Sequence, residues 1–186
     1  MHVALLALLP ALSCAVPLET TRLRLRRLTT GDADFILELL NDPDFVRHVG
    51  DRGLRTRADA VRFLETGPMA SYAQHGYGHY LVTRKDGADA IGICGLRKRD
   101  GLDDPDLGFA LLPALRGAGH AREAAGAVLA EAREVWHLDR VLAITSPDNH
   151  ASIVLLGTLG FTFERMVHLD DTAPALRLFT WLAPPR

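Results

Sequence analysis

A loop with two glycines joins the strand-like run Leu107–Leu112 directly to a helix-forming segment. The glycines are Gly117 and Gly119, and Arg116 and Arg122 flank them. The first turn of a helix leaves backbone N–H groups without partners, and the helix dipole favours negative charge there. Glycine lets a diphosphate approach those amides closely, and arginine is suited to phosphate oxygens. The segment therefore predicts an anion site that suits phosphate.

Other glycine-rich phosphate motifs do not fit this loop. Two glycines before a helix are by themselves a weak signal, because most such sites are only tight turns. No Gly-Lys-Ser/Thr follows, which excludes a P-loop. The glycine spacing is wrong for a dinucleotide fingerprint, and the preceding strand lies late in the chain.

The same loop resembles a known motif. Arg116-Gly-Ala-Gly-His-Ala121 is similar to the Arg/Gln-x-x-Gly-x-Gly/Ala motif of the GNAT superfamily of acyl-CoA-dependent N-acyltransferases. Arg122-Glu-Ala124 continues it as in the RimJ/RimL-like branch, which acetylates the N-termini of ribosomal proteins. The resemblance covers about residues 18–184.

Three further segments resemble that branch in the same order along the chain. Leu18–Arg26 is similar to its opening strand, and Leu107-Gly108-Phe109 to its Ile-Gly-Tyr strand. Asn149-His-Ala-Ser152, followed by Leu159-Gly160-Phe161, resembles its Asn-x-x-Ser and Gly-Phe ending. The joint spacing of four ordered motifs is specific, since a chance fit of all four would be rare.

The resemblance implies acetyl-CoA as the acyl donor, no metal, and a set of residues that hold the donor. Backbone groups of Phe109, Ala110 and Leu111 would pair with the pantetheine arm like an added strand, where two central strands splay apart. An amide near Phe109 would polarise the thioester carbonyl. Asn149 would hydrogen-bond the donor near its thioester end. The residues expected around the pyrophosphate are Arg116, Gly117, Ala118, Gly119, His120, Ala121 and Arg122.

The resemblance also implies a proton donor for the departing thiolate, and Ser152 matches the serine of that branch. The alternative is a structural hydroxyl in the first helical turns that bonds locally to backbone. Other members use a tyrosine seven residues after the asparagine, where this chain has Leu156.

Two residues are candidates for the general base, His79 and Asp106. Histidine has a suitable intrinsic pKa, about 6.5. His79 could instead be a solvent-facing histidine at a strand end, and Asp106 could cap a turn or pair with an arginine. The superfamily position five residues before the asparagine sometimes carries a glutamate, and here it is Ile144.

The absence of a clear strong base bears on the acceptor. A chain α-amine has a pKa of about 8 and is roughly one-tenth neutral at pH 7, whereas lysine, at about 10.4, is less than about one-thousandth neutral. We therefore expect a protein N-terminal α-amine. A small amine, such as an amino acid, a polyamine or an antibiotic, is the first alternative. A non-catalytic acyl-CoA-binding module is the second.

Hydrophobic periodicity predicts the elements that position these residues. Predicted strands lie at 23–28, 80–83, 90–96, 107–112, 140–145, 161–168 and 176–182. Thr30 is expected to cap a first helix that ends at Asn41-Asp42-Pro43, and Thr56 a second that is interrupted near Gly67-Pro68. Later helices are expected at 117–137 and 149–159. This order predicts a single α/β domain at 18–184 with a mixed, mostly antiparallel central sheet and helices on both faces.

Composition excludes several classes of protein. The chain has 186 residues, 21 of them basic and 23 acidic, and this balance argues against sequence-independent binding to nucleic acid. Cys14 and Cys94 stand in unrelated contexts, so no disulfide framework is indicated and a cytoplasmic location fits. The eight histidines show no metal-ligand spacing. A monomer and a homodimer are both open.

Residues 1–17 form an apolar N-terminal extension that needs separate treatment. The run from Val3 to Leu12 is too short to span a bilayer as a helix, so no stable membrane association is expected. A secretory signal would begin with Lys or Arg, and only His2 precedes the run. We therefore interpret the segment as an extension or a misassigned start.

Overall fold

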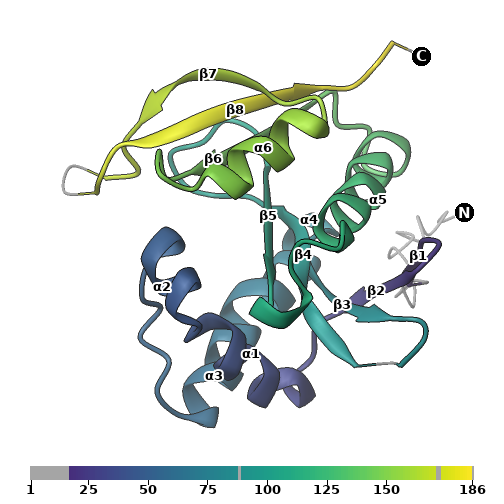
Figure 1. Ribbon diagram of the computed structural model, residues 1–186, viewed down its shortest axis with the longest axis vertical. Helices are drawn as coiled ribbons and strands as arrows, with labels where there is room; N and C mark the ends of the chain where they lie inside the picture. The colour runs from purple at the N-terminus through teal and green to yellow at the C-terminus, as the bar shows by residue number, and fades with distance from the viewer. Residues whose placement is uncertain (1–16, 88, 171–172, 186) are drawn as a thin grey trace, which may run out of the picture.

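The computed structural model describes residues 17–87, 89–170 and 173–185. Within these ranges eight strands form one sheet in the order β1-β2-β3-β4-β5-β6-β8-β7 (Figure 1). The strands are β1 (Leu18–Glu19), β2 (Leu23–Arg27), β3 (His79–Arg84), β4 (Ala90–Arg97), β5 (Asp106–Leu111), β6 (Arg140–Thr145), β7 (Thr162–Val167) and β8 (Leu176–Leu182). Every neighbouring pair is antiparallel except β5 and β6, which are parallel. This confirms the predicted mixed, mostly antiparallel sheet.

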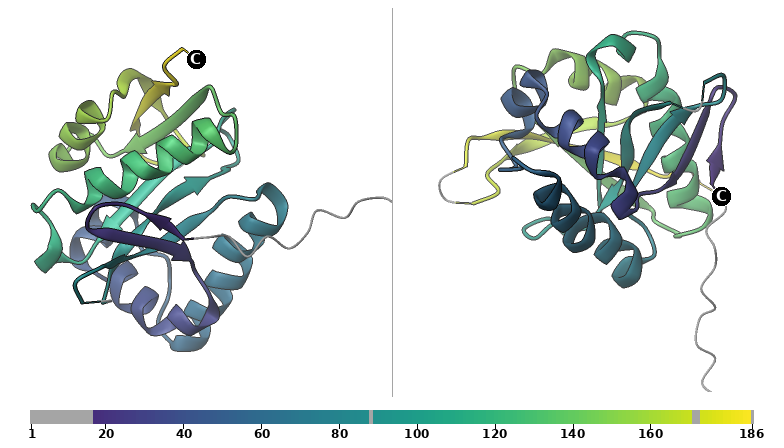
Figure 2. Two further views of the ribbon diagram at one scale, coloured as in Figure 1. Left: turned by 90° about the vertical axis from the view of Figure 1, so that its right-hand side faces the viewer. Right: turned by 90° about the horizontal axis from the view of Figure 1, so that it is seen from below.

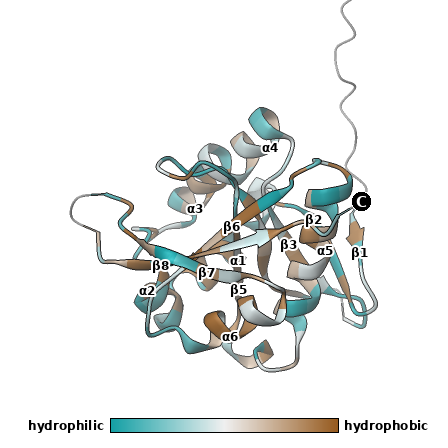
Figure 3. Cartoon of the chain, turned by 90° about the horizontal axis from the view of Figure 1, so that it is seen from above, coloured by the Kyte–Doolittle hydropathy of each residue, from teal (hydrophilic) through white to brown (hydrophobic). Residues whose placement is uncertain are grey.

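Helices cover both faces of the sheet (Figure 2). They are α1 (Ala33–Leu40), α2 (Pro43–Val49), α3 (Arg57–Leu64), α4 (Ala70–His75), α5 (His120–Glu134) and α6 (His150–Thr158). On one face α5 and α6 pack on a core that contains Val82, Cys94 and Leu107. On the other face α1 and α3 pack on Leu81 and Ile93. Figure 3 shows the hydrophobic residues along α6 and β6.

Helix α5 follows from a regular apolar stripe. Ala124, Ala125, Val128, Leu129 and Ala132 are buried, and their three- and four-residue spacing places them on one side of the helix. The helix begins at His120, after Gly119 in a left-handed conformation, and so is shorter than the predicted 117–137. The two glycines stay outside it and form the loop.

The start of the first helix differs from the prediction. Thr29 is the N-cap instead of Thr30, and a short 3-10 turn (η1, Thr30–Asp32) leads into α1. The carboxylate of Asp32 accepts a hydrogen bond from the backbone nitrogen of Thr29 at 2.8 Å. This bond satisfies a donor that the helix leaves open, and so fixes the start one residue earlier.

The prediction that Asn41-Asp42-Pro43 ends the first helix is confirmed, but the same residues also begin α2. The Asp42 side chain accepts from the backbone nitrogen of Phe45 at 3.1 Å, and Pro43 occupies the first helical turn. An N-cap aspartate followed by proline is a helix-start signal as well as a stop signal. Only the stop signal was predicted from the sequence.

The α-helix that follows Thr56 is interrupted near Gly67-Pro68 as predicted, but by a π-helical turn and not by a loop. The chain stays helical from α3 through a π-helical turn (η2, Glu65–Met69) into α4. Proline cannot continue an α-helix without a clash with the carbonyl four residues earlier, and the wider π-turn accommodates Pro68. Thr56 caps α3 as predicted.

No helix in the described part of the chain is long and apolar enough to cross a membrane. The expected N-terminal extension lies outside the described residues, apart from Pro17.

Candidate active site

The sheet opens between β5 and β6. These strands pair in one register position, Asp106 with Leu142, and the backbone nitrogen of Leu142 donates to Pro105 O at 2.9 Å. Beyond that point β5 continues on β4 and β6 continues on β8, so the two strands diverge. We call this the β5–β6 wedge (Figure 1). It is the splayed pair that the sequence analysis expected.

The register decides which main-chain groups of β5 face the wedge. Leu112 N donates to Ile91 O on β4, and backbone groups alternate sides along a strand. Ala110 therefore bonds to β4, opposite Ile93, whereas Phe109 and Leu111 direct theirs into the wedge. Of the three residues expected to offer backbone groups to the donor, Phe109 and Leu111 therefore have theirs on the open side, whereas those of Ala110 are used in the sheet.

The loop after β5 presents a row of backbone amides. Gly117 and Gly119 have φ of +78° and +80°, which only glycine adopts readily. From Gly117 to Arg122, no backbone nitrogen donates to another described residue. A Cβ added at Gly117 would meet no atom within 4 Å, so space lies beside the loop. These amides and this space are the features of an anion site at a helix start.

The side chain of Arg116 is already committed in this structure. It lies 2.6 Å from Asp42 Oδ1, pairs with Asp44 as well, and donates from Nε to Leu111 O at 3.0 Å. Burial acts to raise the pKa of Asp42, but the hydrogen bonds from Arg116 and from Phe45 N hold that pKa below its ordinary value. Arg116 thus fastens the loop to α2.

Arg122 and His120 have different surroundings. Arg122 is exposed in the first turn of α5, and no ion pair joins it to the described residues. His120 Nδ1 lies 3.3 Å from Leu115 O, which holds its ring against the short 3-10 turn η3 (Pro113–Leu115). Of the two predicted arginines, Arg122 is the one with a guanidinium free to meet a ligand phosphate.

Arg22 is a loop contact that the sequence analysis missed. Its Nη1 donates to Ala118 O at 2.9 Å, and its Nε lies 2.6 Å from Glu123 Oε2. It therefore braces the glycine loop from the bend just before β2. Nothing in the sequence distinguishes it from neighbouring arginines, because the contact joins residues about a hundred positions apart.

Helix α2 connects the two sides of the wedge at its open end (Figure 1). Its N-terminal end is bound to the β5 side through Arg116. Its C-terminal end contacts the loop after β6, where Arg47 lies 3.2 Å from Asp148 and His48 Nδ1 lies 3.3 Å from Ser146 Oγ. The helix therefore borders the place where a ligand would enter.

Asn149 and Ser152 lie at the start of α6, directly after β6. The side-chain oxygen of Asn149 accepts from the backbone nitrogen of Ser152 at 3.1 Å, which makes Asn149 the N-cap of α6. This contact accounts for the Asn-x-x-Ser spacing as a capping arrangement. The Asn149 amide nitrogen and the half-buried Ser152 hydroxyl have no hydrogen bond with other described residues.

The side chain of His79 lies over glycines of the two neighbouring strands. His79 pairs with Gly95 on β4, which pairs with Gly108 on β5, and a Cβ added at Gly108 would lie 2.6 Å from His79 Nε2. The imidazole therefore covers the strand just before Phe109. Burial lowers the pKa of His79 to about 4; the carboxylate of Asp106 acts in the opposite direction, and nearby arginines add to the lowering.

Asp106 is buried at the closed end of the wedge, with its side chain 3% exposed. It accepts two hydrogen bonds from Arg99, at 3.0 and 3.3 Å, so the alternative that it pairs with an arginine is confirmed. Because Asp106 and Gly108 are two residues apart, Asp106 and His79 share the sheet face that packs on α1 and α3.

The predicted residues thus form two groups. Phe109, Leu111, the loop amides and the start of α6 surround the wedge, whereas His79 and Asp106 lie near its closed end on one face. The described residues contain no group of three or more His, Cys, Asp or Glu side chains arranged to hold a metal ion.

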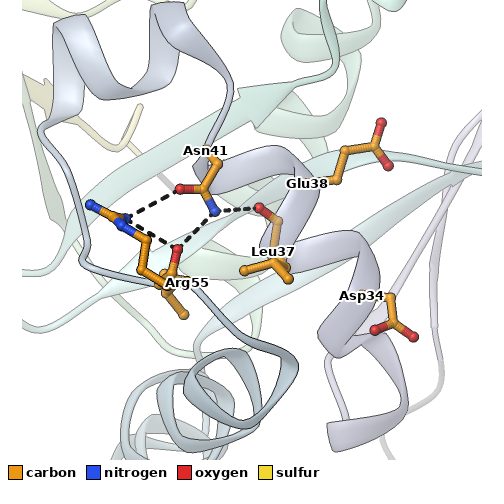
Figure 4. A pocket seen from close by; sticks show the side chains of 6 residues that line it. Asp34, Leu37, Glu38, Asn41 and Arg55 are labelled. Atoms are coloured by element: carbon orange, nitrogen blue, oxygen red, sulfur yellow. Dashed lines mark hydrogen bonds between the residues drawn. The ribbon is translucent and has the colours of Figure 1, made fainter.

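A separate hollow of about 400 Å³ lies on the outer side of α1 (Figure 4). Asn41 Nδ2 donates there to Leu37 O at 2.7 Å and to Leu54 O at 3.0 Å. Arg55 contacts the Asn41 oxygen at 3.5 Å and pairs with Asp51. Its central polar groups satisfy one another, and none of the predicted site residues lines it, so we do not assign it to the site.

Comparison with known proteins agrees with this geometry. The family model described as "Acetyltransferase (GNAT) domain" matches residues 22–162. An uncharacterized N-acetyltransferase of Bacillus subtilis (strain 168), YoaA, is 26% identical over 148 residues, which cover 79% of this chain and 83% of that protein.

Solved structures share the fold at lower identity. An acetyltransferase from Agrobacterium tumefaciens str. C58 superposes with a TM-score of 0.77 at 22% identity, covering 98% of this chain and 100% of that one. RimL, described as a ribosomal L7/L12 α-N-protein acetyltransferase in complex with coenzyme A, superposes with a TM-score of 0.70 at 15% identity, covering 89% and 97%.

Proposed function

The chain belongs to the GNAT acetyltransferase family, and we propose that it acetylates protein N-terminal α-amines with acetyl-CoA through the domain at 18–184. RimL supports the choice of acceptor, since it shares the fold and is described as an α-N-protein acetyltransferase. The observation that carries the proposal is the row of free amides beside the open β5–β6 pair.

Residues of this chain fit the donor at both of its ends. The amides from Gly117 to Arg122 and the exposed guanidinium of Arg122 suit a pyrophosphate. Phe109 N–H and C=O, together with Leu111 N–H, suit the amides of a pantetheine arm as a strand edge would. Acetyl-CoA supplies an activated thioester when bound there.

The arrangement separates donor and acceptor onto opposite faces. Helix α5 packs on one face of the sheet, so a donor that binds at its start enters the wedge from that side. The face that carries His79 and Asp106 is left for the amine. An amine on that face would pass Gly108, which has no side chain, to reach the thioester near Phe109. The Phe109 N–H would donate to the thioester oxygen as charge develops on it.

The basicity of the site favours an α-amine over lysine. A His79 with a pKa of about 4 is a weak base, and Asp106 is held by Arg99. Such a site works best on an amine that is partly neutral at the start, which is roughly one-tenth of an α-amine and less than about one-thousandth of lysine at pH 7. The proposed roles of His79 and Asp106 are therefore to line the acceptor path, with at most weak proton acceptance.

For the proton donor we propose Ser152, with Asn149 as a donor-binding residue. Asn149 uses its oxygen as the cap of α6, which leaves its NH₂ group for the donor. Ser152 lies in the first turn of α6, and its hydroxyl forms no hydrogen bond with the described residues. The hydroxyl could pass a proton to the departing thiolate.

The test is thiol release with a peptide that has both a free N-terminal alanine and an internal lysine. Titration calorimetry should show binding of acetyl-CoA, and mass spectrometry should find the acetyl group mainly on the α-amine. The matched control is the same peptide with a formylated N-terminus, which should be acetylated poorly. Acetylation mainly on lysine would reject the acceptor, and binding without turnover on any amine would reject catalysis.

A further inference from the structure

We propose that the acceptor carries a negatively charged group near its reactive amine, and that Arg52 and Arg97 bind this group beside Arg99. The inference rests on the proposed function, because it concerns the acceptor side of the same wedge. It defines the acceptor as an acidic N-terminus whose carboxylate or phosphate oxygens meet guanidinium groups.

The register of the sheet places Arg97 beside the acceptor path. Arg97 is the last residue of β4 and pairs with Asp106 on β5, so the two side chains share a face. That face also carries His79, because His79 pairs with Gly95, two residues before Arg97. Arg97 therefore lies next to the closed end of the wedge.

Arg52 reaches the same place from a different part of the chain. It belongs to the loop between α2 and α3 and is exposed, and the charges of Arg97, Arg99 and Asp106 act on it. Arg99 completes the group through its two bonds to Asp106. Three arginines thus gather around one buried carboxylate.

The charges of this cluster do not balance. Among the described residues, the carboxylate of Asp106 is bonded to Arg99, whereas Arg52 and Arg97 form no ion pair. Asp100 is exposed, and its charge acts on the pKa of Arg97 less than that of Asp106 does. Burial, and then the neighbouring arginines, lower the pKa values of Arg52 and Arg97.

Two neighbouring guanidinium groups without a carboxylate partner cost free energy unless an anion binds between them. Surrounding protein removes part of their hydration, and like charges repel at short range. Arginine presents planar donors that match the two oxygens of a carboxylate or phosphate. The cluster also disfavours cationic peptides, because lysine or arginine near the N-terminus would be repelled.

The test compares peptides that differ only in charge. One has a free N-terminal alanine followed by two aspartates, its twin has asparagines there, and a third has phosphoserine. Binding is measured by fluorescence anisotropy with coenzyme A present. The wild type should bind the aspartate peptide about tenfold more tightly than its twin, and added salt should reduce the difference. The phosphoserine peptide shows which oxyanion is preferred.

Two variants assign the effect to the cluster. Arg97→Gln and Arg52→Gln should each remove most of the preference for the charged peptides. Arg24→Gln is the matched control, because Arg24 is exposed on β2 and pairs with Glu19. Circular dichroism establishes that each variant is folded.

The outcomes separate the two proposals. Equal affinity for the aspartate and asparagine peptides, or a preference that Arg97→Gln and Arg52→Gln leave unchanged, would overturn the anionic acceptor while leaving acetyl transfer intact. A preference that persists in a protein that releases no thiol with any of these peptides would support the anion site and reject the proposed function.

Discussion

Replacement of His79 by glutamine should remove a specific part of the acid sensitivity of this protein. The imidazole is held neutral in the fold, with a pKa of about 4, whereas in the unfolded chain it has the ordinary value of about 6.5. Between these values the unfolded state binds more protons than the folded state. The stability that depends on neutral His79 is therefore present above about pH 6.5 and is lost as the pH falls toward 4.

The size of the effect follows from the two pKa values. Protonation of His79 in the unfolded chain should lower the free energy of unfolding by about 2 kcal/mol between pH 7 and pH 5. The loss approaches about 3 kcal/mol by pH 4, where the folded group begins to titrate. Glutamine has a similar volume, keeps a polar end over Gly108 and does not titrate. The His79→Gln protein should therefore lose about 2 kcal/mol less than the wild type.

Urea unfolding at pH 7 and pH 5, followed by circular dichroism, measures this difference. Each protein is compared with itself, so that any direct cost of the substitution cancels. The matched control is His75→Gln, which removes a histidine from the surface of α4 and should follow the wild type. If His79→Gln loses as much stability as the wild type between the two pH values, His79 is not held neutral by burial.

Three further predictions concern the loop, the buried pair and the proton donor. Gly119→Val should weaken binding of acetyl-CoA by about tenfold or more in calorimetry, because φ is +80° there and valine is strained at that angle. The control Gly126→Ala, which lies in open space on α5, should not weaken binding. Arg99→Leu leaves the carboxylate of Asp106 buried and should lower the free energy of unfolding in urea by about 3 kcal/mol; a loss within error would mean that neighbouring arginines replace it. Ser152→Ala should lower the rate of thiol release more than acetyl-CoA affinity, and an unchanged rate would leave the hydroxyl structural.

Much of the fold could be predicted because its signals are local. The stripe from Ala124 to Ala132 has helical spacing, and Asn149 is followed three residues later by a residue whose amide it caps. Segments whose residues are compatible with two local structures were harder to predict. Asp42-Pro43 is both a stop and a start, and Pro68 breaks an α-helix but fits a π-turn.

The candidate site was partly predictable for the same reason. The glycine loop and Phe109 follow one another along the chain, so their spacing is visible in the sequence. The cluster at the closed end is not local, because Arg52, Arg97 and Asp106 meet only through strand register and a loop from the helical layer. Likewise the ion pairs of Arg116 with Asp42 and Asp44 depend on the position of α2, which the spacing of residues in the sequence does not give.

Helix α2 is fastened in an unusual way for an element beside a binding site. None of its residues is fully buried, and ion pairs secure both of its ends. Exposed charge pairs weaken as dissolved ions accumulate, whereas apolar packing does not. We therefore expect added salt to weaken the exposed contact of Arg47 with Asp148 at the C-terminal end of α2, and to affect less the partly buried contact of Arg116 with Asp42 at the other end.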